Sequence, residues 1–206
     1  MSKFLTRTSV NIDISNLCAL ECVRCARQIH YRDKGLKVPG ENISTENFKK
    51  VLEHFDSISF CGQLSDPVHH PEFVDFLKMC YNRRKEAIIH NASSTKPIEW
   101  YEQAFRNNPK AKWWFGIDGL PQDSALYRVH QDGEKLFEVM KLAKKILHIL
   151  PKWQYIVFSY NENDVDAAIR IAKSIGVELI LVISSRWNNS RDPLIPKTDK
   201  YRYSPK

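Results

Sequence analysis

The stretch Val10-Asn-Ile-Asp-Ile-Ser-Asn-Leu-Cys-Ala-Leu-Glu-Cys-Val-Arg-Cys-Ala-Arg27 joins a short apolar strand pattern to three cysteines. The cysteines, Cys18, Cys22 and Cys25, follow the spacing C-x3-C-x2-C, which places three thiols on one tight loop. Three thiolates can hold an iron–sulfur cube and leave its fourth iron free for another ligand. Such an open coordination position distinguishes a reactive metal site from a closed structural one.

The composition indicates a soluble globular protein in a reducing compartment. With 206 residues, 43% of them hydrophobic and 27% charged, the chain is long enough for one domain with a buried core. No apolar stretch reaches the length of a membrane span, and the N-terminus has no signal-peptide core. Five cysteines without a secretory signal predict free thiols, so we expect a cytoplasmic protein with a metal site.

The positive charge is concentrated near the C-terminus. Residues 186–206 contain six basic and two acidic residues, a net +4 of the chain's +7, so the preceding body carries only +3. A basic tail is most often a solvated segment, and charge alone carries no sequence information about a partner. Nucleic-acid binding is therefore not expected.

Strand and helix patterns alternate along most of the chain. The expected strands are short and rich in Val, Ile, Phe and Trp: Ser9–Leu17, Ser57–Phe60, Glu86–His90, Lys112–Ile117, Trp153–Tyr160 and Val177–Ser184. Amphipathic helices are expected between them. Apolar stripes with a helical period begin at Phe48, Phe73, Leu136 and Val165, and Pro97 is expected to open a further helix.

Six strand–helix units in a row predict parallel strands joined by right-handed crossovers. An open doubly wound sheet and a curved partial barrel both satisfy this pattern. In either case, functional groups gather in the loops that follow the strands. The alternation stops at Ser185, so the polar remainder is expected to be a linker or a docked extension.

Motifs after successive strands resemble those of radical S-adenosylmethionine (SAM) enzymes with the C-x3-C-x2-C signature. The matching segments, between Ser9 and Ser184, are Phe60-Cys-Gly-Gln-Leu-Ser-Asp-Pro67 with His70-Pro-Glu-Phe73, Asn91-Ala-Ser-Ser94, Gly116-Ile-Asp-Gly119 with Tyr127-Arg128, and Val157-Phe-Ser-Tyr-Asn161. They occur in the family's order, each after its expected strand. The overall pattern is most similar to the core domain of members that modify peptides or proteins. No cysteine follows Cys80, so the C-terminal module with further clusters is not expected here.

The resemblance implies an α/β fold, a six-unit partial (β/α)6 barrel over residues 1–185, with residues 186–206 as a polar basic tail. It also implies an oxidoreductase or radical mutase that uses one [4Fe–4S] cluster, held by Cys18, Cys22 and Cys25, to cleave SAM reductively. An electron donor such as a flavodoxin or ferredoxin is implied as a partner. The SAM contacts implied by the motifs are Arg24, Gly62, Asp66, Asn91, Asp118, Arg128 and Asn161.

Three positions depart from the family pattern. Arg24 stands where an aromatic residue is common, and Asp66 stands where Glu is commoner. Gly116 replaces a residue that is often Ser, which removes one expected ribose contact.

Several alternatives stay open from the sequence. His30 and the three cysteines match the ligand set of a closed zinc site, as in a non-catalytic metal-binding module. Within the radical SAM interpretation, the substrate is a peptide or protein, or alternatively a nucleoside or small metabolite. Asp13 alternates with apolar residues and is a candidate substrate contact inside a barrel.

Overall fold

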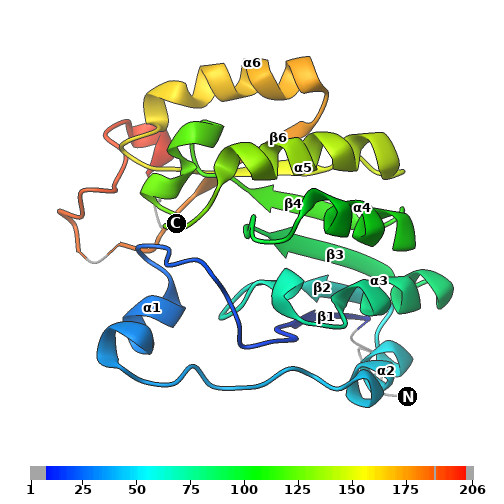
Figure 1. Ribbon diagram of the computed structural model, residues 1–206. Helices are drawn as coiled ribbons and strands as arrows, with labels where there is room; N and C mark the ends of the chain where they lie inside the picture. Colours follow the sequence, from blue (N-terminus) through cyan, green and yellow to red (C-terminus); the bar gives the residue numbers. More distant parts are fainter. Residues whose placement is uncertain (1–7, 188, 203–206) are drawn as a thin grey trace, which may run out of the picture.

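The computed structural model describes residues 8–187 and 189–202 and contains one parallel sheet flanked by helices (Figure 1). The strands are β1 Ser9–Ile12, β2 Ser57–Phe60, β3 Glu86–Asn91, β4 Lys112–Gly116, β5 Lys152–Val157 and β6 Glu178–Ile183. The α-helices are α1 Ala26–His30, α2 Thr45–His54, α3 Phe73–Asn82, α4 Ile98–Asn107, α5 Gly133–Ile146 and α6 Val165–Ile175. Short 3₁₀ turns are η1 Arg32–Lys34, η2 Pro67–His69, η3 Pro121–Leu126, η4 Glu162–Asp164 and η5 Asp199–Tyr201.

The strands pair in chain order, from β1 at one edge of the sheet to β6 at the other. A doubly wound sheet requires a reversal of strand order, so the consecutive order selects the curved partial barrel. Right-handed crossovers between consecutive strands put their helices on one side of the sheet. Accordingly, α2 packs on α3, α3 on α4 and α4 on α5. The predicted six-unit α/β architecture is confirmed.

The hydrophobic core lies between the sheet and these helices. Along β4 and β5, alternate residues such as Trp113, Phe115, Trp153 and Tyr155 are fully buried there. The ring of Trp113 meets the edge of Phe105 from α4, with centroids 4.9 Å apart. The residues between these core positions face the opposite, concave side of the sheet.

β1 and β5 end several residues earlier than the sequence predicts, and β4 and β6 end one residue earlier. β1 ends at Ile12 because its register partner Phe60 is the last residue of β2. β5 ends at Val157 because the backbone N–H of Phe158 donates to the Asn161 side chain rather than to the ladder. α5 ends at Ile146, after which the N–H of His148 donates to the Pro109 carbonyl.

The segment after β6 returns to the loop that follows β5. The N–H of Ser159 donates to the carbonyl of Leu194 at 3.0 Å. The carboxylate of Glu162 accepts hydrogen bonds from the backbone N–H groups of Lys197 and Thr198, at 2.9 and 2.8 Å. The described part of this segment is therefore attached to the barrel by hydrogen bonds that its own backbone groups make.

Within residues 8–187 and 189–202, no helix has the length and apolar character that a membrane crossing requires.

The same isoleucine-to-alanine substitution should destabilise the protein strongly at a buried position and little at an exposed one. Ile58 is 0% exposed in β2, whereas Ile169 on α6 is 46% exposed. Ile58→Ala leaves a cavity in the core and should lower the free energy of unfolding by about 2–5 kcal/mol. Ile169→Ala is the matched control and should change it by less than about 0.5 kcal/mol. Urea denaturation followed by tryptophan fluorescence measures both; equal effects would contradict the assigned core.

Candidate functional site

A cavity of about 510 Å³ opens at the carboxyl ends of the strands. Its wall combines the cysteine loop after β1, the loops after β2, β3 and β4, and the concave faces of the central strands. In Figure 1, α1 and the cysteine loop lie on the side toward which the strand arrows point. The cavity therefore occupies the position where α/β folds of this kind carry their functional groups.

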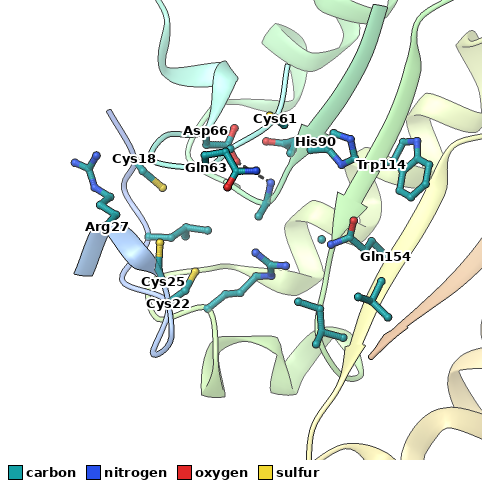
Figure 2. A pocket seen from close by; sticks show the side chains of 18 of the residues that line it. Cys18, Cys22, Cys25, Arg27, Cys61, Gln63, Asp66, His90, Trp114 and Gln154 are labelled. Carbon is teal, nitrogen blue, oxygen red and sulfur yellow. Dashed lines mark hydrogen bonds between the residues drawn. The ribbon is translucent and has the colours of Figure 1, made fainter. Parts of the chain in front are cut away.

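The three cysteines line one side of this cavity (Figure 2). The sulfur atoms of Cys18, Cys22 and Cys25 face across it toward His90, Trp114 and Gln154. All three are free thiols. Burial raises the pKa of Cys18 to about 12 and that of Cys22 to about 11. A metal that binds a thiol deprotonates it outright, so thiolate formation here belongs with metal binding.

Backbone hydrogen bonds give the cysteine loop its shape. The N–H groups of Glu21 and Val23 donate to the carbonyls of Val129 and Tyr127, both at 3.1 Å. The N–H of Cys25 donates to the Cys22 carbonyl at 3.0 Å, and α1 begins at the next residue. These bonds fix the second and third thiols relative to the segment that follows β4.

Two side chains that the sequence reasoning did not single out for the site attach this loop to its neighbours. Arg27 donates from one nitrogen to the carbonyls of Asn16 and Leu64, at 2.5 and 2.8 Å. The ring of His69 accepts from the N–H of Ala19 at 3.3 Å. Accepting requires an unprotonated nitrogen, and burial lowers the pKa of His69 accordingly.

The cysteines are not arranged around a single ion. Among the residues that the structure describes, no three His, Cys, Asp or Glu side chains are placed to hold one metal ion. Sulfurs at about 2.3 Å from one zinc would lie within about 4 Å of one another. His30, the fourth ligand of the zinc alternative, is exposed and does not line the cavity. In an iron–sulfur cube each thiolate binds a different iron, so that site needs no such close contact.

Asp66 joins the loops after β2 and β3. One of its carboxylate oxygens accepts from the N–H groups of Ala92 and Ser93, at 2.7 and 2.9 Å. The other accepts from the N–H of Val68 at 3.2 Å and faces the Asn91 amide at 3.1 Å. Burial raises the pKa of Asp66, and the backbone donors act in the opposite direction. Both oxygens are thus engaged within the protein, and Asp66 lines the cavity as a bridge between two loops.

Gly62, in the same loop, leaves room for a close backbone approach. A Cβ atom there would collide with the carbonyl oxygen of Ser65. The loop after β2 can therefore turn tightly at the cavity wall only with glycine at this position.

Arg128 lines the cavity, and its guanidinium is held by a buried ion pair. The Nε of Arg128 lies 2.7 Å from a carboxylate oxygen of Asp118, and the other Asp118 oxygen accepts from the N–H of Ile156 at 2.8 Å. Gly116 provides the space, because a Cβ atom there would lie 2.7 Å from a terminal Arg128 nitrogen. Glycine at position 116, where related motifs often have serine, thus leaves room for the Arg128 side chain.

Four residues assigned to ligand contacts from the sequence lie off the cavity wall. Asp118 supports Arg128 as described above. Asn161 bonds to the backbone of Phe158. Asp13 accepts from both the N–H and the hydroxyl of Ser65. Arg24 forms an ion pair with Asp192 at 2.9 Å.

The wall opposite the cysteines contains residues that the sequence reasoning did not assign. His90 on β3 and Trp114 on β4 are register partners with rings 5.2 Å apart, and Gln154 follows on β5. Each is a partly buried residue between two fully buried neighbours. This alternation along the strands was the signal for a lined interior face.

No family model matches this chain, and no curated protein matches it. Solved structures do match. Against Streptococcus suis SuiB the TM-score is 0.69 with 10% sequence identity, over 94% of this chain and 43% of that one. Against anSMEcpe with bound AdoMet it is 0.64 with 19% identity, over 89% and 56%. Against methylornithine synthase (PylB) it is 0.60 with 12% identity, over 93% and 57%.

These three proteins are radical SAM enzymes, and the chain shares the fold of their core. The chain spans about half the length of the structures that it matches. At these identities the likeness establishes the fold, and the predicted radical SAM type of partial barrel is confirmed in that sense.

The Asp66 bridge can be tested by hydrogen exchange. In Asp66→Asn, an amide NH₂ replaces one of the accepting oxygens, so buried donors lose their partner, which costs about 1–3 kcal/mol. Exchange at the amides of Ala92 and Ser93 should become faster, measured by mass spectrometry or NMR. Asp33→Asn, at an exposed aspartate in η1, should leave the exchange of both amides unchanged. Unchanged exchange in Asp66→Asn would show that the bridge does not hold this loop.

Proposed function

We propose that this protein is a radical SAM enzyme, with a [4Fe–4S] cluster held by Cys18, Cys22 and Cys25. The single observation that carries the proposal is that three free thiols, on a loop fixed by backbone hydrogen bonds, face a cavity at the carboxyl ends of a partial barrel. Three ligands leave one iron open, as cofactor binding to a cluster requires. The shared fold of SuiB and anSMEcpe, both solved with SAM, supports this interpretation.

The residues on the cavity wall suit SAM as a ligand. A volume of about 510 Å³ lies in the range of cofactor sites. Arg128 contacts Asp118 through its Nε, so the N–H donors on its two terminal nitrogens are left for a ligand. A guanidinium is well matched to a carboxylate. Gly62, Asp66 and Asn91 form the neighbouring wall, where SAM's amino group and ribose would find backbone and side-chain polar groups. Asp118 acts through Arg128.

When bound, the reduced cluster supplies the electron that cleaves the sulfonium of SAM and generates a radical able to abstract hydrogen. The role of the protein's own residues is to bind SAM and to orient it. Arg128 neutralises and positions the carboxylate of SAM, and Asp118 fixes the direction of the guanidinium. The loops joined by Asp66 keep their backbone donors and acceptors at fixed places, so little is reorganised during the reaction. An electron donor such as a flavodoxin or ferredoxin would supply the electron.

We further propose a peptide or protein as the substrate. SuiB has been solved with precursor peptide SuiA, and anSMEcpe with a Kp18Cys peptide. A nucleoside or small metabolite is the second candidate, favoured by the presence of methylornithine synthase among the matches. A non-catalytic metal-binding module is the interpretation that remains if no SAM is cleaved.

The cluster is tested by a matched pair of cysteine variants. After anaerobic reconstitution, Cys22→Ala should lose the brown iron–sulfur absorbance and the reductive conversion of SAM to 5′-deoxyadenosine, because it lacks one of three ligands. Cys61→Ala changes a thiol on the same cavity wall but outside the loop, and it should keep the cluster. Zinc instead of iron in the purified chain, or equal iron content in both variants, would refute the assignment.

The substrate class is tested by stimulated turnover. Peptide mixtures should raise the release of 5′-deoxyadenosine by the reconstituted enzyme at least about tenfold above the substrate-free rate, because bound substrate couples SAM cleavage to hydrogen abstraction. Nucleosides and amino acids at the same concentration should not. Cys22→Ala is the background control. Stimulation by nucleosides or amino acids alone would reject the peptide and support the metabolite.

A further inference from the structure

The wall opposite the cysteines includes uncharged polar groups and one aromatic ring, beside apolar residues of β5 and β6 such as Ile156 and Val182. Asn11, Ser59, His90 and Gln154 come from strands β1, β2, β3 and β5, and Trp114 from β4 lies among them. Figure 2 shows His90, Trp114 and Gln154 across the cavity from the three sulfurs. This wall is therefore the part of the cavity that a substrate would reach beyond the cluster and SAM.

Two of these groups, Asn11 and Ser59, are register partners on β1 and β2. Within residues 8–187 and 189–202, no hydrogen bond engages their side chains, of which that of Asn11 is exposed and that of Ser59 is partly buried. Polar groups that face a cavity without a protein partner bind water or a ligand, because leaving them unpaired is costly. The wall thus presents free hydrogen-bond donors and acceptors to a ligand in the cavity.

None of these five side chains carries a charge at neutral pH, and the lysines nearest to them are paired with glutamates. Lys112 is paired with Glu86, and Lys152 with Glu178 at 3.2 Å. The ammonium of Lys152 lies 4.7 Å from the centroid of the Trp114 ring. Burial lowers the pKa of His90, with a hydrogen bond to Gln154 acting in the opposite direction. The imidazole is therefore neutral near pH 7, and the ring nitrogen that does not bond to Gln154 is left for a ligand.

We propose that this wall is a substrate subsite that binds an uncharged planar carboxamide, such as a peptide bond, against Trp114, with His90 and Gln154 as its hydrogen-bonding partners. A carboxamide has a flat face for the indole and one donor and one acceptor edge for the two side chains. An ammonium would lose its hydration beside the like charge of Lys152, and a carboxylate would lose its hydration next to a lysine that is already paired with Glu178, which disfavours both. The inference rests on the proposed function, since it names the chemical group of the substrate that the cavity would bind.

Ligand-detected NMR tests the subsite without turnover. The probes are N-acetylglycine methylamide, which is uncharged, and N-acetylglycine, which carries a carboxylate. With the reconstituted full chain, saturation transfer should reach the methylamide and be at least about fivefold weaker for the acid. Loss of one neutral hydrogen bond corresponds to about a fivefold weaker affinity, so Gln154→Met and His90→Phe should each reduce the methylamide signal by about that factor.

Matched controls separate a local effect from a loss of fold. Gln103→Met on α4 and His54→Phe on α2 make the same changes at exposed positions and should bind like the wild type. A midpoint of thermal unfolding close to that of the wild type shows that Gln154→Met is folded. Equal signals from the acid and the methylamide, or wild-type binding by folded Gln154→Met, would overturn the proposal.

The same measurement on Cys22→Ala distinguishes the two proposals. Because the subsite lies across the cavity from the thiols, this variant should still bind the methylamide. If the wild type fails to form a cluster yet binds the methylamide with the expected losses in the variants, the proposed function fails and the subsite stands. If SAM is cleaved but the methylamide is not bound, the subsite alone fails.

Discussion

Pairing of six parallel strands in chain order is the constraint on which the rest of the structure depends. With every crossover right-handed, one face of the sheet is covered by helices and the other curves around an interior. All strand carboxyl ends then meet at one rim, and the loops after β1, β2, β3 and β4 contribute to the same cavity. The cysteine loop, the Asp66 loop and Arg128 are far apart in the sequence and meet only because of this order.

Rigidity at that rim comes mainly from backbone groups. The cysteine loop is held by the carbonyls of Tyr127 and Val129, and Asp66 collects N–H groups from the next loop. Backbone donors and acceptors are present whatever the side chains, so the contacts within the cysteine loop do not require particular residue types. The same fold occurs in SuiB and PylB at only 10% and 12% identity.

The sequence predicted the architecture well because it is encoded in local patterns. Apolar strand segments and helical stripes specified six units, and Ser44 and Gly176 cap the ends of α2 and α6. It also predicted the cysteine loop, since the three thiols are close in the chain. It did not separate the residues that line the cavity from those that lie behind its wall. Asp118 and Asn161 follow strands as cavity residues do, but they bond to protein groups, which depends on three-dimensional register.

The space at Gly116 has a consequence for how such sequences diverge. The Arg128 guanidinium occupies the volume that a side chain at position 116 would need, so adding a side chain there requires the guanidinium to move. The serine that is common at this position in related motifs would therefore change where the guanidinium lies relative to Asp118. Substitutions at two contacting positions of this kind have a joint effect that differs from the sum of the single changes. Chains with glycine and chains with serine at this position would share the barrel and differ in where the arginine points.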